Sequence, residues 1–152
     1  MSKPLKVGDK AADFDLPAVG DKKVKLSDLL GSKKVILSFH PLAFTGICAD
    51  QMKDLDTNQD ILEAKSTVAL GISIDSVPAK EAWKKQLGIE HVEFLSDFNP
   101  KGNVAEKYGI YRSEDGFSER AVYVIDEEGL VIFAKVYPIG ERPDVEEILN
   151  IL

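Results

Sequence analysis

The sequence predicts an α/β protein in which a central mixed β-sheet is flanked by helices. Three observations point to this class. Two apolar runs of strand length, at residues 34–39 and 67–74, are typical of strands that are buried on both faces. A segment with helical apolar spacing follows each of these runs, which is the order of a βαβ unit. Alternating β-type runs precede and follow this unit, so we expect both parallel and antiparallel pairs in the sheet.

Length and composition indicate one ordinary globular domain, which we predict over residues 1–152. The chain is 44% hydrophobic and 30% charged, and it is long enough to bury a substantial core. Its net charge of −7 disfavours nucleic acid and anionic membranes as partners, because both would repel it. The first six residues lack the apolar region of a signal peptide, and no stretch is long enough to span a bilayer. With one cysteine, no intramolecular disulfide can form, so we expect a cytoplasmic location.

The first part of the chain is expected to form a β-ribbon, a helical turn and a buried strand. Asp13–Leu16 and Lys23–Leu26 have β-type alternation and are separated by a glycine-containing turn. Ser27–Leu30 has the pattern of a capped helical turn, and the glycine that follows ends it. Lys34–Phe39 is the first buried strand.

The middle of the chain predicts two helices around a second buried strand. A helix is expected over residues 46–64, with an apolar stripe formed by Cys48, Met52, Leu55 and Leu62. Thr67–Ile74 is the second buried strand. Val77–Leu87 is the next helix, because a proline stands in its first turn and Gly88 lies just past its end.

The last third of the chain alternates short elements. In chain order we expect a strand, a helix, a polar loop, two hairpin strands and a final helix, at Glu93–Ser96, Asn103–Tyr108, Tyr111–Glu119, Ala121–Asp126, Leu130–Val136 and Pro143–Leu152. This order completes a sheet with helices on both sides.

Cys48 lies in the first turn of a predicted helix, just past the end of a buried strand. The helix N-terminus offers unpaired N–H groups and a positive dipole, and both favour a thiolate. Thr45 is placed to cap the helix by accepting the Cys48 N–H, or to donate a hydrogen bond to the sulfur. Pro41 stiffens the turn and is placed to shield the sulfur from water. The segment is therefore a candidate site for a reactive thiol.

Pro41, Thr45 and Cys48 form the pattern Pro-x-x-x-Thr-x-x-Cys, which resembles the active-site signature of the peroxiredoxins, a family of thiol peroxidases. The segment Phe39–Cys48 is most similar to the small one-cysteine bacterial members of the AhpE type. The resemblance implies a thioredoxin-like fold with an N-terminal β-ribbon. It also implies that Cys48 reduces hydrogen peroxide or small organic hydroperoxides and becomes a sulfenic acid.

By the same resemblance, Arg120 is the expected second half of the site. It directly precedes a predicted strand, where the family carries its active-site arginine, and a charged planar fork suits both a thiolate and peroxide oxygens. The N–H of Ile47 and the amide of Gln51 are candidates on the substrate side. Gln51 stands where many members carry an acid, and its amide could orient Arg120 by hydrogen bonding. Arg112 and Arg142 lie in polar segments and are expected to be solvated.

The single cysteine means that an external thiol is expected to reduce the sulfenic acid: a thioredoxin, a glutaredoxin-like protein or a low-molecular-weight thiol. We expect no metal or cofactor, because two histidines and one cysteine cannot build the usual Cys/His metal site. The resemblance further implies a homodimer that pairs through the face around the cysteine loop. Phe44, Ser76–Pro78 and Phe98–Pro100 would lie in that contact.

Other interpretations remain open from the residues alone. A lone cysteine is often a small buried hydrophobic residue. A thioredoxin-fold thiol–disulfide oxidoreductase would share the fold, although Thr45 occupies the first position of its Cys-x-x-Cys motif. A chaperone or regulatory binding module would use the fold without sulfur chemistry. Pro41 also fits a plain turn, His40 a partly buried structural residue, and Trp83 and Phe98 core or interface positions.

Overall fold

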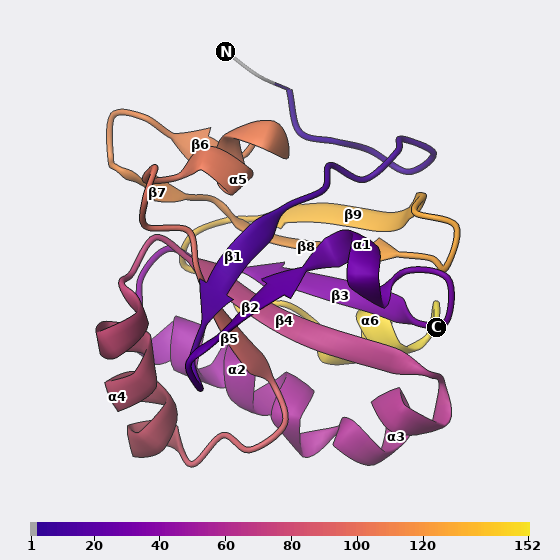
Figure 1. Ribbon diagram of the computed structural model, residues 1–152, viewed down its shortest axis with the longest axis horizontal. Helices are drawn as coiled ribbons and strands as arrows, with labels where there is room; N and C mark the ends of the chain where they lie inside the picture. The colour runs from indigo at the N-terminus through magenta and orange to yellow at the C-terminus, as the bar shows by residue number, and fades with distance from the viewer. Residues whose placement is uncertain (1–2) are drawn as a thin grey trace.

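The computed structural model describes residues 3–152 and contains a seven-stranded sheet with helices on both faces (Figure 1). The strands of this sheet are β1 (Asp15–Ala18), β2 (Lys22–Lys25), β3 (Lys34–Phe39), β4 (Thr67–Ser73), β5 (Glu93–Ser96), β8 (Arg120–Ile125) and β9 (Val131–Tyr137). Their order across the sheet is β2-β1-β5-β4-β3-β8-β9. Strand β4 pairs parallel with β3 and β5, and the other pairs are antiparallel. The predicted mixed sheet with an N-terminal ribbon is confirmed.

Two hydrophobic cores lie on the two faces of the sheet. The helices are α1 (Leu26–Leu29), α2 (Gly46–Thr57), α3 (Gln59–Ala64), α4 (Val77–Leu87), α5 (Asn103–Lys107) and α6 (Val145–Leu149). Buried side chains of α2, α3, α4 and α6 share one core, and those of α1 and α5 share the other. A small hairpin of β6 (Tyr111–Arg112) and β7 (Phe117–Ser118) follows α5 (Figure 1).

The strand expected at Asp13–Leu16 lies two residues later, and the capped turn expected at Ser27–Leu30 is α1, which has no side-chain cap. Three further elements differ from the structure. The helix expected over residues 46–64 is divided at Asn58, whose side-chain amide donates to the Asp54 carbonyl and ends α2. The segment Tyr111–Glu119, expected to be a loop, contains the β6–β7 hairpin. The helix expected over Pro143–Leu152 is limited to Val145–Leu149, because the side chain of Asp144 caps it by accepting the Glu146 N–H.

The alternation of β3 determines which residues face the cysteine helix. Val35, Leu37 and Phe39 point into the core shared with α1 and α5, while Ile36 belongs to the core shared with α2. Because successive side chains of a strand point to opposite faces, Ser38 lies on the α2 side as well. The same alternation along β8 sends Val122 to the α2 side.

The parallel strands β3, β4 and β5 end at the same edge of the sheet, and the segments that follow them are joined by hydrogen bonds. Residues 40–45, called the cysteine loop below, follow β3 and lead into α2. The Ala43 N–H donates to the Asp75 carboxylate after β4 (2.8 Å). The Asp97 N–H after β5 donates to the Ser73 carbonyl (2.8 Å). This edge is therefore where a site can be assembled from several strands.

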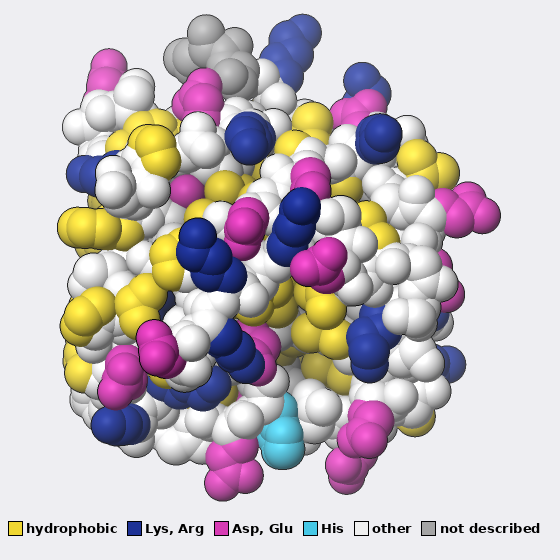
Figure 2. Space-filling model, in the orientation of Figure 1, with side chains coloured by type: hydrophobic (Ala, Val, Ile, Leu, Met, Phe, Trp, Pro, Cys, Tyr) yellow, Lys and Arg dark blue, Asp and Glu magenta, His cyan; other side chains and the backbone are white. Residues whose placement is uncertain are grey.

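The surface seen in Figure 2 carries Lys and Arg side chains interspersed with Asp and Glu, so on this face neither sign of charge is gathered into one region. Within residues 3–152, no helix is both long and apolar enough to cross a membrane. The first two residues of the N-terminal segment discussed above lie outside the described part of the chain.

Candidate active site

Cys48 is the third residue of α2 and its side chain has no exposed surface. Met52 and Leu55 follow it on the same buried face of α2, and Leu62 of α3 is buried with them, as the helical spacing predicted. The sulfur is thus held between the helix and the sheet rather than at the surface.

Arg120 lies beside this sulfur because of the register of the sheet. Ala121 pairs with Phe39, the last residue of β3, so Arg120 is one step beyond it, level with the start of the cysteine loop. Its parity along β8 sends the side chain to the α2 face. Arg120 is 3% exposed, and its Nη1 donates to Cys48 Sγ at 3.2 Å.

The guanidinium of Arg120 is held in place on both sides. Its Nη1 also donates to Gln51 Oε1 (2.8 Å), while Nε and Nη2 both donate to the Ile139 carbonyl (3.0 and 2.9 Å). Ile139 follows β9, and no motif or pattern in the sequence indicated that it would contact the site. A fixed fork of this kind directs one N–H at the sulfur and loses little freedom when charge develops there.

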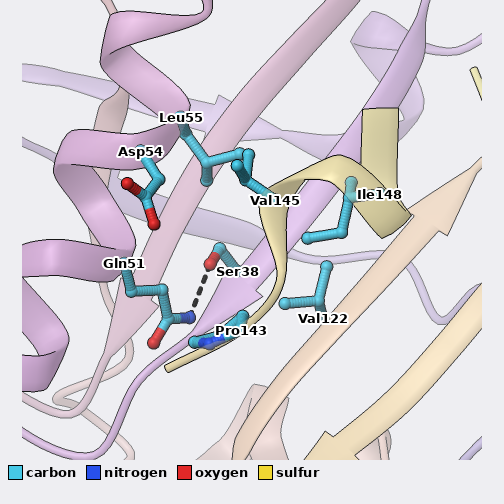
Figure 3. Close-up of a pocket in the computed structure, with 8 residues that line it drawn as sticks. All are labelled: Ser38, Gln51, Asp54, Leu55, Val122, Pro143, Val145 and Ile148. Carbon is cyan, nitrogen blue, oxygen red and sulfur yellow. Dashed lines mark hydrogen bonds between the residues drawn. The ribbon is translucent and has the colours of Figure 1, made fainter. Parts of the chain in front are cut away.

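Gln51 connects Arg120 to β3. Its amide nitrogen donates to Ser38 Oγ (2.6 Å) and to the Phe39 carbonyl (3.1 Å), which leaves its oxygen directed at Arg120. Figure 3 shows Gln51 reaching from α2 to Ser38 on the strand, beside a small cavity whose lining includes Pro143 and Val145. The neutral amide therefore holds the arginine, as the sequence had suggested it could.

Thr45 is the N-cap residue of α2, but it makes no side-chain capping bond. Its Oγ1 instead donates to the Leu42 carbonyl (2.8 Å), inside the cysteine loop. The two contacts expected from the sequence, with the Cys48 N–H and with the sulfur, are both absent from the structure. A threonine hydroxyl can bond to nearby backbone groups in place of a helix N–H, and here it takes the carbonyl three residues earlier.

A pocket of about 320 Å³ lies between the cysteine loop, the start of α2 and the segments around β7 and β9, and Arg120, the hydrogen-bond donor to the Cys48 sulfur, is part of its wall. Its lining comprises Pro41, Leu42, Thr45, Gly46, Ile47, Phe117, Arg120, Ile139 and Gly140. Four of the six residues proposed from the sequence, Pro41, Thr45, Ile47 and Arg120, lie in this wall, while Cys48 and Gln51 are buried and do not line the pocket. Phe117 was not predicted as a site residue, because its segment was expected to be a polar loop.

His40 is fully buried, not partly buried as expected. Its Nδ1 lies 3.3 Å from the Ser38 carbonyl, which can only accept, so this nitrogen carries the hydrogen. Its Nε2 faces Lys80 Nζ at 3.3 Å. Burial, together with the charge of Lys80, lowers the pKa of His40 well below its ordinary value, so the ring is neutral.

The other two arginines lie apart from this site. Arg112 pairs with Asp115 and Glu119 on the β6–β7 hairpin, and Arg142 pairs with Asp54 of α2. Their side chains are 37% and 53% exposed, which agrees with the expectation that they are solvated.

Three comparisons with known proteins bear on this geometry. The model of the AhpC/TSA family matches residues 7–134. The chain is 36% identical over 140 residues to alkyl hydroperoxide reductase E of Mycobacterium tuberculosis, which covers 92% of this chain and 91% of that protein. It is 32% identical over 153 residues to the chloroplastic 2-Cys peroxiredoxin BAS1 of Spinacia oleracea, covering 96% of this chain and 58% of the relative.

Solved structures of peroxiredoxins have the same fold. The reduced 2-Cys peroxiredoxin of Plasmodium vivax superimposes with a TM-score of 0.87 at 33% identity, covering 97% of this chain and 80% of that one. AhpC of Mycobacterium tuberculosis gives 0.86 at 23% identity, covering 98% and 96%, and so supports the fold alone. The predicted thioredoxin-like fold is confirmed.

Proposed function

Since the chain belongs to the AhpC/TSA family and is a peroxiredoxin, we propose that Cys48 is its peroxidatic nucleophile, in a one-cysteine cycle completed by an external thiol. The observation that carries this proposal is the contact of 3.2 Å between Arg120 Nη1 and Cys48 Sγ. A cation fixed against a buried sulfur stabilises the thiolate, which is the nucleophilic form of cysteine.

The reaction has two half-cycles. The Cys48 thiolate attacks the terminal oxygen of the hydroperoxide: the S–O bond forms, the O–O bond breaks, and the departing alkoxide or hydroxide takes a proton to leave as alcohol or water. Arg120 stabilises the negative charge as it moves from sulfur to the leaving oxygen. An external thiol then attacks the sulfenic acid, releasing water and forming a mixed disulfide, and a second thiol restores Cys48.

The pocket supports small hydroperoxides as substrates. Its wall is mostly apolar, since Pro41, Ile47, Phe117 and Ile139 contribute hydrocarbon surface, and Arg120 is the charged group that reaches into it. A volume of about 320 Å³ admits hydrogen peroxide or a short organic hydroperoxide. The N–H of Ile47 in the first turn of α2 is available as a further donor to a peroxide oxygen.

The reductant comes from outside the chain in this proposal, because the sequence contains one cysteine. A thioredoxin, a glutaredoxin-like protein or a low-molecular-weight thiol would each supply the two electrons of the second half-cycle. A reducing compartment such as the cytoplasm provides these thiols, and we place the protein there for that reason.

One equivalent of peroxide should convert Cys48 into a sulfenic acid, which a dimedone-type reagent traps and mass spectrometry locates. We expect near-complete labelling of Cys48 after peroxide treatment and little labelling of Cys48 in protein that has not been treated with peroxide. A chaperone or binding module of this fold predicts no adduct. A thiol–disulfide oxidoreductase predicts reduction of insulin disulfides, which we expect not to occur, since Thr45 occupies the first cysteine position of the Cys-x-x-Cys motif.

We also propose a homodimer that pairs across the edge where β3, β4 and β5 end. Phe44 in the cysteine loop and Phe98 after β5 are each 54% exposed at this edge, which is a large apolar surface for a monomer to leave in water. Residues 76–78 follow β4 and begin α4 between these two segments.

Sedimentation equilibrium at micromolar concentration should give the mass of two chains. The Phe98→Ser variant should shift the equilibrium toward one chain, because it removes apolar surface from the contact. Ile61→Ser is the matched control, since Ile61 is also exposed (43%) but lies on α3, away from this edge. A single-chain mass for the unaltered protein, or equal shifts in both variants, would contradict the dimer.

A further inference from the structure

Lys80 is a fully buried lysine on the inner face of α4, and no pattern in the sequence distinguishes it from the exposed lysines. It lies one turn from Trp83 on the same face of the helix, so the packing that buries the tryptophan also buries the lysine. Its Nζ is within hydrogen-bond distance of three acceptors: Ser73 Oγ (2.8 Å), the Gly71 carbonyl (3.2 Å) and His40 Nε2 (3.3 Å).

These three partners fit the ammonium form. An ammonium has three N–H donors, whereas a neutral amine has two and needs a donor for its lone pair. The Gly71 carbonyl has no hydrogen, and His40 carries its hydrogen on Nδ1. The Ser73 hydroxyl donates its own hydrogen to Asp75 Oδ2 (2.7 Å). When Lys80 loses its proton, one of the three contacts must therefore be lost.

The contacts of Lys80 continue to the cysteine loop. Ser73, to which Lys80 donates, donates in turn to Asp75 Oδ2, and the same oxygen accepts the Ala43 N–H (2.8 Å). Lys80 also contacts His40, the first residue of the loop, directly. The buried ammonium thus binds the loop at its start and, through two side chains, at its middle.

We propose that Lys80 is a positioning residue for the peroxidase reaction, whose buried ammonium holds the cysteine loop in its active geometry through His40, Ser73 and Asp75. This inference rests on the proposed function of Cys48. The loop supplies Pro41 and Thr45 to the pocket wall and leads into the turn that carries the nucleophile. Small displacements of such groups reduce the rate of an oriented reaction strongly.

The charge of Lys80 changes near neutral pH. Burial lowers the pKa of Lys80 to about 7, against the attraction of negative charge at Asp75, Cys48 and Asp97. Lys80 and His40 lie close together, and four further charged or titratable groups face them. Asp75 comes from the β4–α4 connection, Cys48 from α2, Asp97 from the segment after β5 and Arg120 from β8. Above neutral pH the lysine becomes neutral, and the hold on the loop weakens.

Stability and activity should respond to this titration in opposite directions. The folded-state pKa of Lys80, about 7, lies below the ordinary value of 10.5. Between these two values the unfolded chain binds more protons at Lys80, so its contribution to the free energy of unfolding rises with pH and is lost as the pH falls through about 7. A fall in rate above neutral pH therefore cannot come from unfolding caused by this group.

The test compares Lys80→Met, Ser73→Ala and their double variant with Lys85→Met, an exposed lysine of the same helix. The rate constant for oxidation of Cys48 by hydrogen peroxide is measured by rapid mixing across a pH series, and unfolding by denaturant at each pH. Ser73→Ala keeps the buried lysine, so it tests the path to Asp75 even where Lys80→Met fails to fold. The double variant measures whether the two residues act together.

We expect the rate constant of the unaltered protein and of Lys85→Met to fall above neutral pH while stability rises. Lys80→Met should be slower by about tenfold or more at neutral pH and should lack the fall at higher pH. Ser73→Ala keeps the lysine and its contact with His40, so it should be slower at neutral pH and show a smaller fall at higher pH. The double variant should be no slower than the slower single one. The positioning role would be overturned if Lys80→Met and Ser73→Ala both left the rate constant unchanged, or if Lys80→Met kept the pH profile of the unaltered protein. It would also be overturned if the effects of the two substitutions multiplied independently in the double variant. Absence of Cys48 oxidation in the unaltered protein would instead overturn the proposed function.

Discussion

The Cys48→Ser variant should lose peroxidase activity by at least about 10³-fold, because a hydroxyl at this position is neither ionised nor polarisable enough to attack an O–O bond. The substitution exchanges one buried atom for a slightly smaller one, and the hydroxyl can still accept the hydrogen bond from Arg120. Folding should therefore persist. Consumption of hydrogen peroxide with an excess of dithiol reductant measures the loss, and circular dichroism verifies the fold.

Rates that match those of the unaltered protein would remove Cys48 from the mechanism. The comparison is unusually direct, since the sequence contains no other cysteine that could take over the reaction. Ser38→Ala is a useful companion, because it removes the partner of Gln51 on β3 while leaving the nucleophile and the arginine present.

Arg120→Lys should slow the oxidation of Cys48 by between about 10² and 10³-fold, a loss comparable to that of a preorganised donor at a developing anion. Lysine retains the charge but has a single nitrogen. It cannot contact Cys48, Gln51 and the Ile139 carbonyl at once, as the guanidinium does through three nitrogens. The rate constant for oxidation of Cys48 by hydrogen peroxide, measured by rapid mixing, should show this loss.

Arg112→Lys is the matched control for this prediction. Arg112 is partly exposed and pairs with carboxylates of its own hairpin, so its substitution should leave the rate constant unchanged. Equal rates for Arg120→Lys and Arg112→Lys would show that the contact with the sulfur does not contribute to the reaction.

The strands and longer helices could be predicted because their patterns are local. Lys34–Phe39 and Glu93–Ser96 have the bounds that the apolar runs indicated, and Val77–Leu87 ends where Gly88 adopts a left-handed conformation, with φ of 69°. The β6–β7 hairpin was missed because two-residue strands are too short to show alternation. The division of the long helix depends on one side-chain hydrogen bond of Asn58, which periodicity does not contain.

The site was predictable to the extent that its residues are neighbours in the motif or match the family pattern. Lys80 could not be predicted, because a lysine in an amphipathic helix is expected in water and only the packing of α4 against β4 and β5 buries it. The partners of Thr45 and the anchoring of Arg120 by the Ile139 carbonyl depend on loop geometry, which no spacing in the sequence encodes.

The complete burial of Cys48 makes the two half-cycles unequal in their demands on the protein. A peroxide is small enough to enter the pocket, whose wall includes Arg120 and Ile47, the neighbours of the buried sulfur, so oxidation requires only a small displacement of the folded protein. A thiol carried by a protein reductant must approach the sulfur in line, and the first turn of α2 and the cysteine loop stand in its way. The lifetime of the sulfenic acid, and with it the exposure of the enzyme to further oxidation, is then governed by how often this turn opens.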